Sequence, residues 1–380
     1  MNIHARRYDT GQAVNIACAD GRIASIQPLE SEDESLPHVA PAFLDLQVNG
    51  FGGQDFTDPS LTVEHVEKIS LAMDEQGCGG YCPTVTTQAF DVLAHSLRTI
   101  ASVCERSSDV ARRVVGLHVE GPYICAEDGP RGAHPVEHCR PPDWDEFQRL
   151  QEAADGRIRI LTLSPDYEGS AEFIRKVADT GVVVAIGHTA ANTEQIEAAV
   201  DAGARLSTHL GNGAHSQIKR HPNYIWDQLA EDRLWASLIA DGHHLPPAVV
   251  KSFLRGKTPE RCLLVSDITG MAGMPPGDYP NTSLGDIRIT EDGRIVVAAM
   301  PQYLAGASLP MTVGVANLLR WGEVDMATAI DMASLRPAQL MGLDDRGRLE
   351  ADCRADLILF SSEPLTGGGR SFELQQLVRC

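Results

Sequence analysis

The stretch FLDLQV, residues 43–48, is a short, mainly apolar run, and seven comparable runs follow it along the chain. Near-continuous apolar runs of this length are typical of parallel strands that are buried on both faces. Helical stretches lie between them, such as NTEQIEAAVDAG, in which Asn192 and Gln195 have the spacing of a capping box. Eight strands that alternate with helices predict a (β/α)₈ TIM-type barrel. The runs cover residues 43–48, 81–87, 113–119, 157–163, 182–187, 204–210, 236–241 and 261–267.

The two ends of the chain have a different pattern. AVNIACADGRIASIQP, residues 13–28, predicts two short strands around a DGR turn, and GRLEADCRADLILF, residues 347–360, is again strand-like. We therefore expect residues 1–40 and 345–380 to form a small β-sandwich domain beside a hydrolase barrel of residues 41–344. A further hairpin is predicted in RITEDGRIVVAA, residues 288–299, after the eighth strand.

Composition limits the classes of partner. The 380 residues carry a formal net charge of −20, which argues against nucleic acid and anionic membranes as partners. The sequence has no run of 18 apolar residues and no apolar segment near its start that resembles a secretory signal. Its nine cysteines are irregularly spaced, which is typical of reduced thiols. These features predict a cytoplasmic protein.

Polar residues close most of the predicted strands. Glu120 closes the third strand, His188 the fifth, His209 the sixth and Asp267 the eighth, while the seventh ends in DGHH. Because a barrel carries its chemistry at the carboxyl ends of its strands, we expect these side chains to converge. Two imidazoles and one carboxylate suit a catalytic divalent metal, so Glu120, His188 and His209 are the candidate ligands.

Other residues compete for roles at this site. Asp267 is the candidate general base for a metal-activated water, and a histidine of DGHH is a candidate to polarise a carbonyl. His118 faces the same side of its strand as Glu120, and we expect it to support the site or to pack in the core. His134 lies in a loop that is expected near the barrel mouth. Cys125 and Cys139 are alternative thiolate ligands, although a His/Glu set suits a hydrolytic metal at least as well.

One basic cluster follows a strand end. QIKRHPN, residues 217–223, comes after the sixth strand, and it contains Arg220. An arginine there is either a clamp for an anionic substrate or an exposed charge, and the local sequence leaves both readings open.

Eight motifs occur in a fixed order between about residues 40 and 360. They are PAFLDLQVNGFGGQDF, GLHVEGPY, RGAHP, AIGHTAA, THLGNG, DGHHL, VSDITG and LAGASLPM. Together they resemble the N-acetylglucosamine-6-phosphate deacetylase family of the amidohydrolase superfamily. The resemblance implies deacetylation of an N-acetylated amino-sugar phosphate to the amino-sugar phosphate and acetate. It also implies one divalent metal per subunit, with Zn²⁺ expected and Fe²⁺, Co²⁺ or Mn²⁺ as alternatives.

The resemblance assigns roles position by position. It implies Glu120, His188 and His209 as metal ligands, Asp267 as the acid/base group and His244 as a substrate contact. It also implies substrate contacts at Ala133, Asn212, Gly213, Leu304, Ala305 and Gly306, and a phosphate contact at Arg220. In the family this arginine often reaches the active site of the neighbouring subunit, which implies a homodimer.

The sequence also departs from the family. The first strand of many such barrels ends in His-x-His and binds a metal, whereas this chain has Gln47 and Asn49. Neutral amides are poor ligands for a transition metal, so we expect these two side chains to contact water or sugar beside a single metal. GNGA, residues 211–214, and KRHPN, residues 219–223, differ from the usual family sequences, which suggests a wider or differently shaped sugar pocket.

These departures leave alternative functions open. The expected substrate is N-acetylglucosamine 6-phosphate, with a relative such as N-acetylgalactosamine 6-phosphate or an unphosphorylated acetylated sugar as alternatives. Another amidohydrolase activity is one alternative, although the usual His-x-His is missing. A catalytically inactive sugar-phosphate-binding barrel is a second alternative, and the complete set of ligands and base argues against it.

Overall fold

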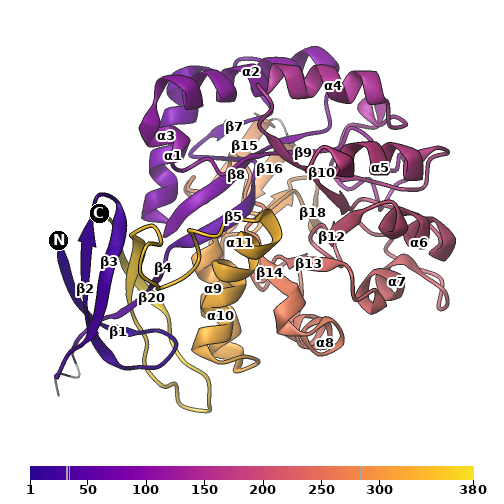
Figure 1. Ribbon diagram of the computed structural model, residues 1–380. Coiled ribbons are helices and arrows are strands. Elements are labelled where there is room, and N and C mark those ends of the chain that lie inside the picture. The colour runs from indigo at the N-terminus through magenta and orange to yellow at the C-terminus, as the bar shows by residue number, and fades with distance from the viewer. Residues whose placement is uncertain (31–32, 34, 283) are drawn as a thin grey trace.

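The computed structural model describes residues 1–30, 33, 35–282 and 284–380. Its centre is a sheet of eight parallel strands, surrounded by helices (Figure 1). In spatial order the strands are β14 (Cys262–Leu264), β13 (Trp235–Leu238), β12 (Ala204–Ser207), β11 (Val183–Ile186), β10 (Ile158–Leu163), β9 (Leu117–Glu120), β8 (Cys78–Thr86) and β5 (Phe43–Val48). The predicted (β/α)₈ barrel is therefore confirmed.

The two edges of this sheet meet and close the barrel. Beyond β14, the backbone N–H of Asp267 donates to the carbonyl oxygen of Gln47 at 3.0 Å, and that of Asn49 donates to Ile268 at 2.8 Å. The carboxyl ends of strands β5 and β14 are thus held side by side. This closure brings Gln47 and Asn49 next to Asp267, although more than 200 residues separate them in the sequence.

The barrel helices follow the predicted alternation with strands. Asn192 caps α6 (Thr193–Asp201): its side chain accepts from the Gln195 N–H at 2.9 Å, and its own N–H donates to Gln195 Oε1 at 2.8 Å. The predicted capping box is confirmed. The other helices are α1 (Val63–Glu75), α2 (Phe90–Arg106), α3 (Ser108–Ala111), α4 (Trp144–Ala153), α5 (Ser170–Asp179), α7 (Tyr224–Ala230), α8 (Pro247–Lys257), α9 (Met311–Trp321), α10 (Met326–Ala333) and α11 (Leu335–Met341).

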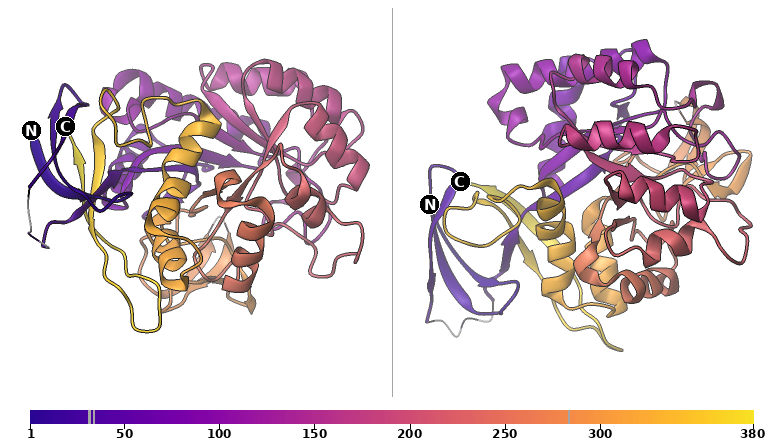
Figure 2. Two further views of the ribbon diagram at one scale, coloured as in Figure 1. Left: turned by 60° about the horizontal axis from the view of Figure 1, so that its bottom comes forward. Right: turned by 45° about the vertical axis from the view of Figure 1, so that its right-hand side comes forward.

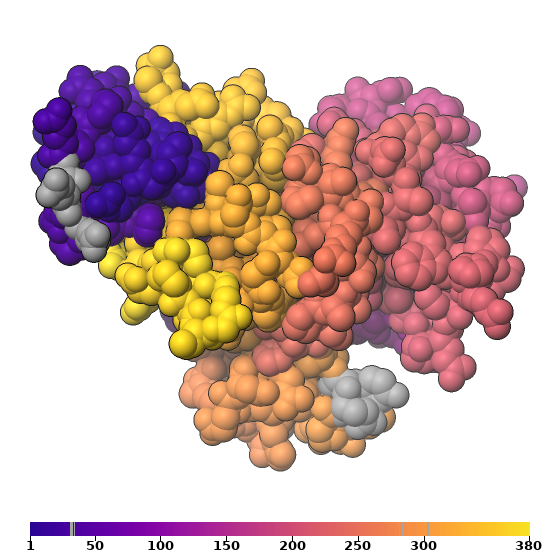
Figure 3. Space-filling model, turned by 90° about the horizontal axis from the view of Figure 1, so that it is seen from below, coloured from indigo at the N-terminus to yellow at the C-terminus, as the bar shows by residue number. Residues whose placement is uncertain are grey.

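The two ends of the chain build one six-stranded sheet beside the barrel. Its order is β20-β19-β4-β1-β2-β3, so the carboxyl-terminal β19 pairs with the amino-terminal β4. Figures 2 and 3 show the first and last segments lying together at one side of the molecule. The strands are β1 (Asn2–Arg7), β2 (Ala13–Ala19), β3 (Arg22–Pro28), β4 (His38–Pro41), β19 (Asp356–Ser361) and β20 (Glu373–Arg379).

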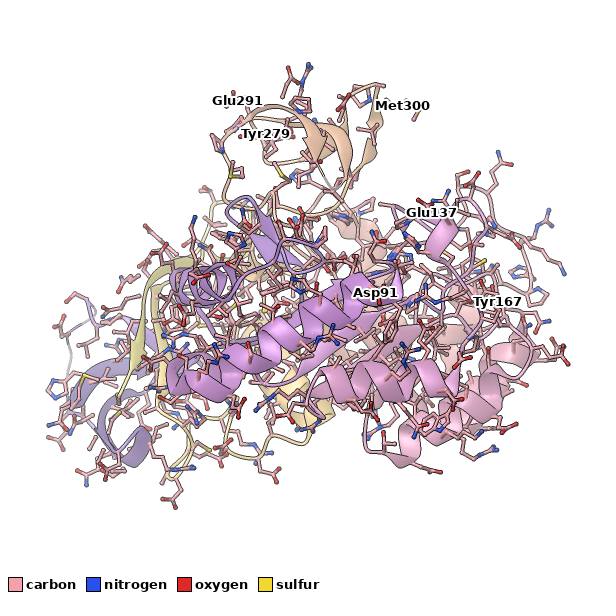
Figure 4. The ribbon with its side chains drawn as sticks, turned by 90° about the horizontal axis from the view of Figure 1, so that it is seen from above. Asp91, Glu137, Tyr167, Tyr279, Glu291 and Met300 are labelled. Carbon is pink, nitrogen blue, oxygen red and sulfur yellow. The ribbon has the colours of Figure 1, made fainter. Side chains whose placement is uncertain are left out.

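An insertion after β14 forms a third, four-stranded antiparallel sheet. Its strands are β15 (Gly277–Thr282), β16 (Gly285–Ile289), β17 (Ile295–Val297) and β18 (Met300–Leu304). The predicted hairpin corresponds to β16 and β17, whereas the sequence pattern missed the two outer strands. In Figure 4 the labelled side chains of Tyr279, Glu291 and Met300 mark this sheet, which stands away from the barrel. A two-stranded hairpin, β6 (Gly50–Phe51) and β7 (Gln54–Asp55), follows β5.

No helix in the described part of the chain is long and apolar enough to cross a membrane.

Candidate metal centre and active site

Three predicted ligands converge at the carboxyl end of the barrel. Oε1 of Glu120 lies 3.0 Å from Nε2 of His209 and 3.3 Å from Nε2 of His188. The two imidazole nitrogens are 3.1 Å apart. All three side chains are buried. A tetrahedral metal with bonds of about 2.0–2.1 Å holds its ligand atoms about 3.3 Å apart, so these separations suit one small divalent ion.

The hydrogen bonds around the cluster direct its lone pairs inward. Nδ1 of His188 lies 2.8 Å from the carbonyl oxygen of Pro130, which can only accept, so Nδ1 carries the proton and Nε2 is free to bind a metal. Gln47 donates from Nε2 to Oε1 of Glu120 at 2.9 Å and orients that carboxylate. Burial alone would raise the pKa of Glu120, but the imidazoles of His188 and His209 beside it hold that pKa well below its usual range.

The backbone is strained where the strands end. His188, His209 and Asp267 have φ values of +51°, +30° and +54°, a region that residues with a Cβ seldom adopt. Each such residue costs on the order of 1–3 kcal/mol, and such strain is concentrated at functional sites. The ends of β11, β12 and β14 thus share this conformation, and all three side chains line the same cavity.

Asp267 lies beside the cluster and faces the same cavity. Burial raises the pKa of Asp267 to about 6, and the negative charge of Glu120 adds to this shift. Asn49 donates from Nδ2 to Oδ1 of Asp267 at 2.8 Å, so the second amide of the first strand orients the candidate base. The two amides that replace His-x-His therefore each contact one acid. Gln47 contacts the candidate ligand Glu120, and Asn49 contacts the candidate base Asp267.

A third histidine joins the cluster from a loop. Nε2 of His134 lies 3.3 Å from Nε2 of His188, and Glu120, His134 and His188 offer ligand atoms within 4.8 Å of one another. Burial lowers the pKa of His134 to about 3, with a further contribution from His188. Its Nδ1 is buried without a hydrogen-bond partner in the described structure. The sequence indicated only that His134 lies near the mouth, so its direct contact with the cluster is new information.

His244 is held by an acid that the sequence analysis did not single out. Oδ2 of Asp241 accepts from Nδ1 of His244 at 2.7 Å. Its other oxygen accepts the backbone N–H groups of His243 and His244 at 2.8 and 2.9 Å. Burial acts to raise the pKa of Asp241, but the contacts with His244 outweigh it and lower that pKa. The DGHH motif is thus a tight turn in which its first residue fixes the ring of its last.

These groups surround a cavity of about 430 Å³, within the usual range of small-molecule sites. Gln47 lies behind Glu120, outside the lining. Arg220 is exposed and also lies outside it. The predicted residues that line the cavity are Asn49, Glu120, Ala133, His188, His209, Asn212, Gly213, His244, Asp267, Leu304, Ala305 and Gly306.

Two glycines of GNGA have a packing role. A Cβ on Gly213 would lie 2.7 Å from Nδ1 of His188, and its φ of +56° also favours glycine. A Cβ on Gly211 would lie 3.0 Å from the Phe253 ring of α8. The space that a Cβ would take on either glycine is therefore already filled by protein side chains.

His118 supports the barrel beneath the site. Its Nδ1 lies 3.1 Å from the carbonyl oxygen of Leu46, and its Nε2 lies 2.8 Å from Oγ1 of Thr162. Oγ1 of Thr162 in turn lies 2.7 Å from Oγ1 of Thr208, the residue before His209. Since both ring nitrogens are engaged, His118 links three strands and does not line the cavity.

The closed barrel and the buried Glu/His cluster define the class of metal-dependent barrel hydrolases. The model of the amidohydrolase family matches residues 38–379, and the chain belongs to this family. It is 34% identical to N-acetylgalactosamine-6-phosphate deacetylase of Escherichia coli O157:H7, over 90% of this chain and 89% of that protein. It is also 34% identical to human N-acetylglucosamine-6-phosphate deacetylase, over 84% of this chain and 79% of that protein.

A solved structure gives the same likeness in three dimensions. A mutant of N-acetyl-D-glucosamine-6-phosphate deacetylase from Mycobacterium smegmatis, in complex with N-acetyl-D-glucosamine-6-phosphate, superimposes with a TM-score of 0.84. The two chains are 25% identical, and the match covers 95% of each. The resemblance seen in the sequence motifs is thus confirmed at the level of the family and the whole fold.

Proposed function

We propose that this protein is a metal-dependent deacetylase of N-acetylglucosamine 6-phosphate or of a close N-acetylated amino-sugar phosphate. The observation that carries the proposal is the convergence of Glu120, His188 and His209 within 3.0–3.3 Å, with Asp267 on the same cavity. The products are acetate and the free amino-sugar phosphate. The free thiols of all nine cysteines favour a reducing, cytoplasmic setting.

Glu120, His188 and His209 are the proposed ligands of one divalent ion, for which Zn²⁺ is favoured by the nitrogen-rich donor set. Such an ion, when bound, lowers the pKa of a water and polarises the acetyl oxygen. Gln47 keeps Glu120 in its ligating orientation through the 2.9 Å hydrogen bond. Gln47 and Asn49 stand where many such barrels have two histidines that bind a metal. Because neutral amides are poor ligands for a transition metal, we predict one ion per subunit.

Asp267 is the proposed proton carrier. A carboxylate whose pKa is raised by burial is a better base near neutral pH than an ordinary aspartate. It accepts a proton from the attacking water and delivers it to the sugar nitrogen as the amide bond breaks. His244 donates a hydrogen bond from Nε2 to the acetyl oxygen as negative charge develops there, and Asp241 holds the ring from the other side.

The sugar is expected to bind between two loops. Ala133, Asn212 and Gly213 line the cavity, and so do Leu304, Ala305 and Gly306. The chain's relatives act on sugars with a 6-phosphate. Arg220 is exposed outside the cavity of its own chain, so we propose that it binds the phosphate in the site of a second subunit. Ile218, two residues before Arg220, and Trp226 on α7 are 42% and 50% exposed, and they are suited to such a homodimer contact.

A substrate panel tests the proposal. Acetate release is measured from the N-acetyl-6-phosphates of glucosamine and galactosamine, from both unphosphorylated sugars and from a cyclic amide. We expect turnover of at least one phosphorylated sugar, far above the unphosphorylated ones. Turnover of the cyclic amide alone would favour another amidohydrolase activity. Tight sugar-phosphate binding without acetate release from metal-loaded protein would favour an inactive binding barrel.

The phosphate contact has its own test. Arg220→Ala should raise KM for the phosphorylated sugar by at least tenfold, since it removes a charge-assisted contact of roughly 1.5–3 kcal/mol. Arg255→Ala, an exposed arginine on α8, serves as the matched control. Sedimentation analysis of the wild-type protein measures the oligomer directly, and a monomer at assay concentration would contradict the shared-site proposal.

A further inference from the structure

A second cavity lies at the other end of the barrel from the candidate active site. It has a volume of about 470 Å³ and is lined mainly by charged side chains. Its lining residues come from the β2–β3 turn, from α3 and the residue after it, from the segment before β19 and from Cys380. The candidate ligand Glu120 ends β9, whereas α3 lies before the start of that strand. The two cavities are therefore at opposite ends of β9. The lining includes Arg22, Arg112, Arg354, Asp20, Asp109 and Ser108.

The cavity borders a network with more arginines than carboxylates. The carboxylate of Asp356 contacts four arginine side chains at 2.9–3.5 Å. One of the four, Arg379, also contacts Asp74, which in turn contacts a fifth arginine, Arg113. Five guanidinium groups therefore share two carboxylates, in a protein whose net charge is −20. Burial lowers the pKa of Arg346 to about 10, and the positive charge of Arg354 adds to the shift. Like charges this close are destabilising unless an anion compensates them. The five are Arg112, Arg113, Arg346, Arg354 and Arg379.

Two arginines of the network also line the cavity, and each is hydrogen-bonded to Asp356 through one guanidinium nitrogen. Nη2 of Arg112 contacts Oδ1 of Asp356 at 3.0 Å, but its buried Nε has no hydrogen-bond partner in the described structure. Arg354 contacts Oδ2 of the same carboxylate through Nε at 3.1 Å. Arg22 pairs with Arg354 across an antiparallel bridge, which brings a third guanidinium to the same face. Guanidinium groups in this arrangement match the several oxygens of a phosphate.

We propose that this cavity is a second ligand site, which takes a small phosphate ester that carries a protonated amine. Arg22, Arg112 and Arg354 bind the phosphate, and the carboxylates of Asp20 and Asp109 attract the amine. The volume is within the range of small-molecule sites, roughly 300–1,000 Å³. An amino-sugar phosphate has this chemistry, and naming it as the ligand rests on the proposed function, because it is the product of that reaction.

Calorimetry with three probes tests the site in the metal-loaded protein. Glucosamine 6-phosphate, glucose 6-phosphate and inorganic phosphate are titrated into the wild type and into Arg22→Gln, Arg112→Gln and Arg255→Gln. We expect two equivalents of glucosamine 6-phosphate per wild-type chain, one of them weakened at least tenfold in the first two variants. Arg255→Gln, on the distant α8, should match the wild type. Arg22 makes no contact with Asp356, so its variant reports on the site even if Arg112→Gln fails to fold.

The outcomes separate this site from the active site. Binding of glucosamine 6-phosphate that is unchanged in Arg22→Gln and in a folded Arg112→Gln would overturn the proposal, whether the wild type binds one equivalent or two. Equal affinity of the second site for glucosamine 6-phosphate and glucose 6-phosphate would overturn the role of Asp20 and Asp109. Acetate release is measured on the same samples. A protein that binds the second equivalent but releases no acetate would contradict the proposed function and leave the second site standing.

Discussion

Asp241→Asn is the most informative single substitution at the candidate site. Asp241 does not line the cavity, but it holds His244, which does. One carboxylate oxygen accepts two backbone N–H groups at 2.8 and 2.9 Å, and the other accepts Nδ1 of His244 at 2.7 Å. Asparagine keeps the oxygen that the backbone needs. Its NH₂ group then faces Nδ1, which must become an acceptor, so the hydrogen bond that orients the ring is reversed and loses its charged acceptor.

The size of the effect follows from the lost contact. A hydrogen bond between charged groups contributes roughly 1.5–3 kcal/mol. If His244 stabilises the developing oxyanion, this amount is lost in the transition state, and kcat/KM falls about 10- to 150-fold at about 1.4 kcal/mol per decade. The loss should appear mainly in kcat, because Asp241 does not touch the substrate.

Acetate release by the wild type, Asp241→Asn and the control Asp232→Asn measures the effect, with metal content determined on the same preparations. Asp232 is exposed and distant from the DGHH turn. A kcat/KM within threefold of the wild type, at unchanged metal content, would refute the role of the Asp241–His244 pair. A fall in metal content would also refute it, since neither residue is a proposed ligand.

Three further substitutions test other parts of the structure. Asp267→Asn should retain the metal and lose about 10²–10⁴ in kcat, and near-wild-type turnover would show that the base is wrongly assigned. The double variant Gln47→His, Asn49→His should raise the bound metal from about one to about two ions per subunit, whereas an unchanged value would show that the amides do not occupy a potential second site. Asp356→Asn should lower the free energy of unfolding by about 3–5 kcal/mol in urea at pH 7, because it removes the buried carboxylate that four partly buried arginines share. Burial acts to raise the pKa of Asp356, but its arginines outweigh this and lower it. The stabilisation is therefore complete above the unfolded pKa near 3.9 and is lost as the pH falls further, so the difference between wild type and variant should narrow below about pH 4.

The barrel and much of the site were predictable because both depend on short-range patterns. Each strand is a local apolar run, and a parallel barrel brings the carboxyl ends of all its strands to one face. Glu120, His188, His209 and Asp267 could therefore be grouped without knowing any long-range contact. The same logic selected Gln47 and Asn49, whose partners, Glu120 and Asp267, are two of these groups.

The parts that the sequence did not predict depend on loops and on distant contacts. His134 reaches the cluster from a loop, and no periodicity fixes where a loop side chain points. Asp241 was passed over because its role is to orient His244. The outer strands of the β15–β18 sheet contain Pro280 and Pro301, which weaken a strand pattern. The arginine network joins residues from both ends of the chain, so it has no local signature.

Metal content combined with acetate release tests the central claim most directly. The protein is purified, and its ions are counted by elemental analysis before and after chelation and again after reconstitution with Zn²⁺. Acetate release from N-acetylglucosamine 6-phosphate and N-acetylgalactosamine 6-phosphate is measured at each stage. We predict about one ion per subunit, activity that is lost with the ion and restored with it, and little bound ion in Glu120→Gln or His209→Ala. Undiminished activity in the metal-free protein, or full metal binding in both ligand variants, would contradict the account.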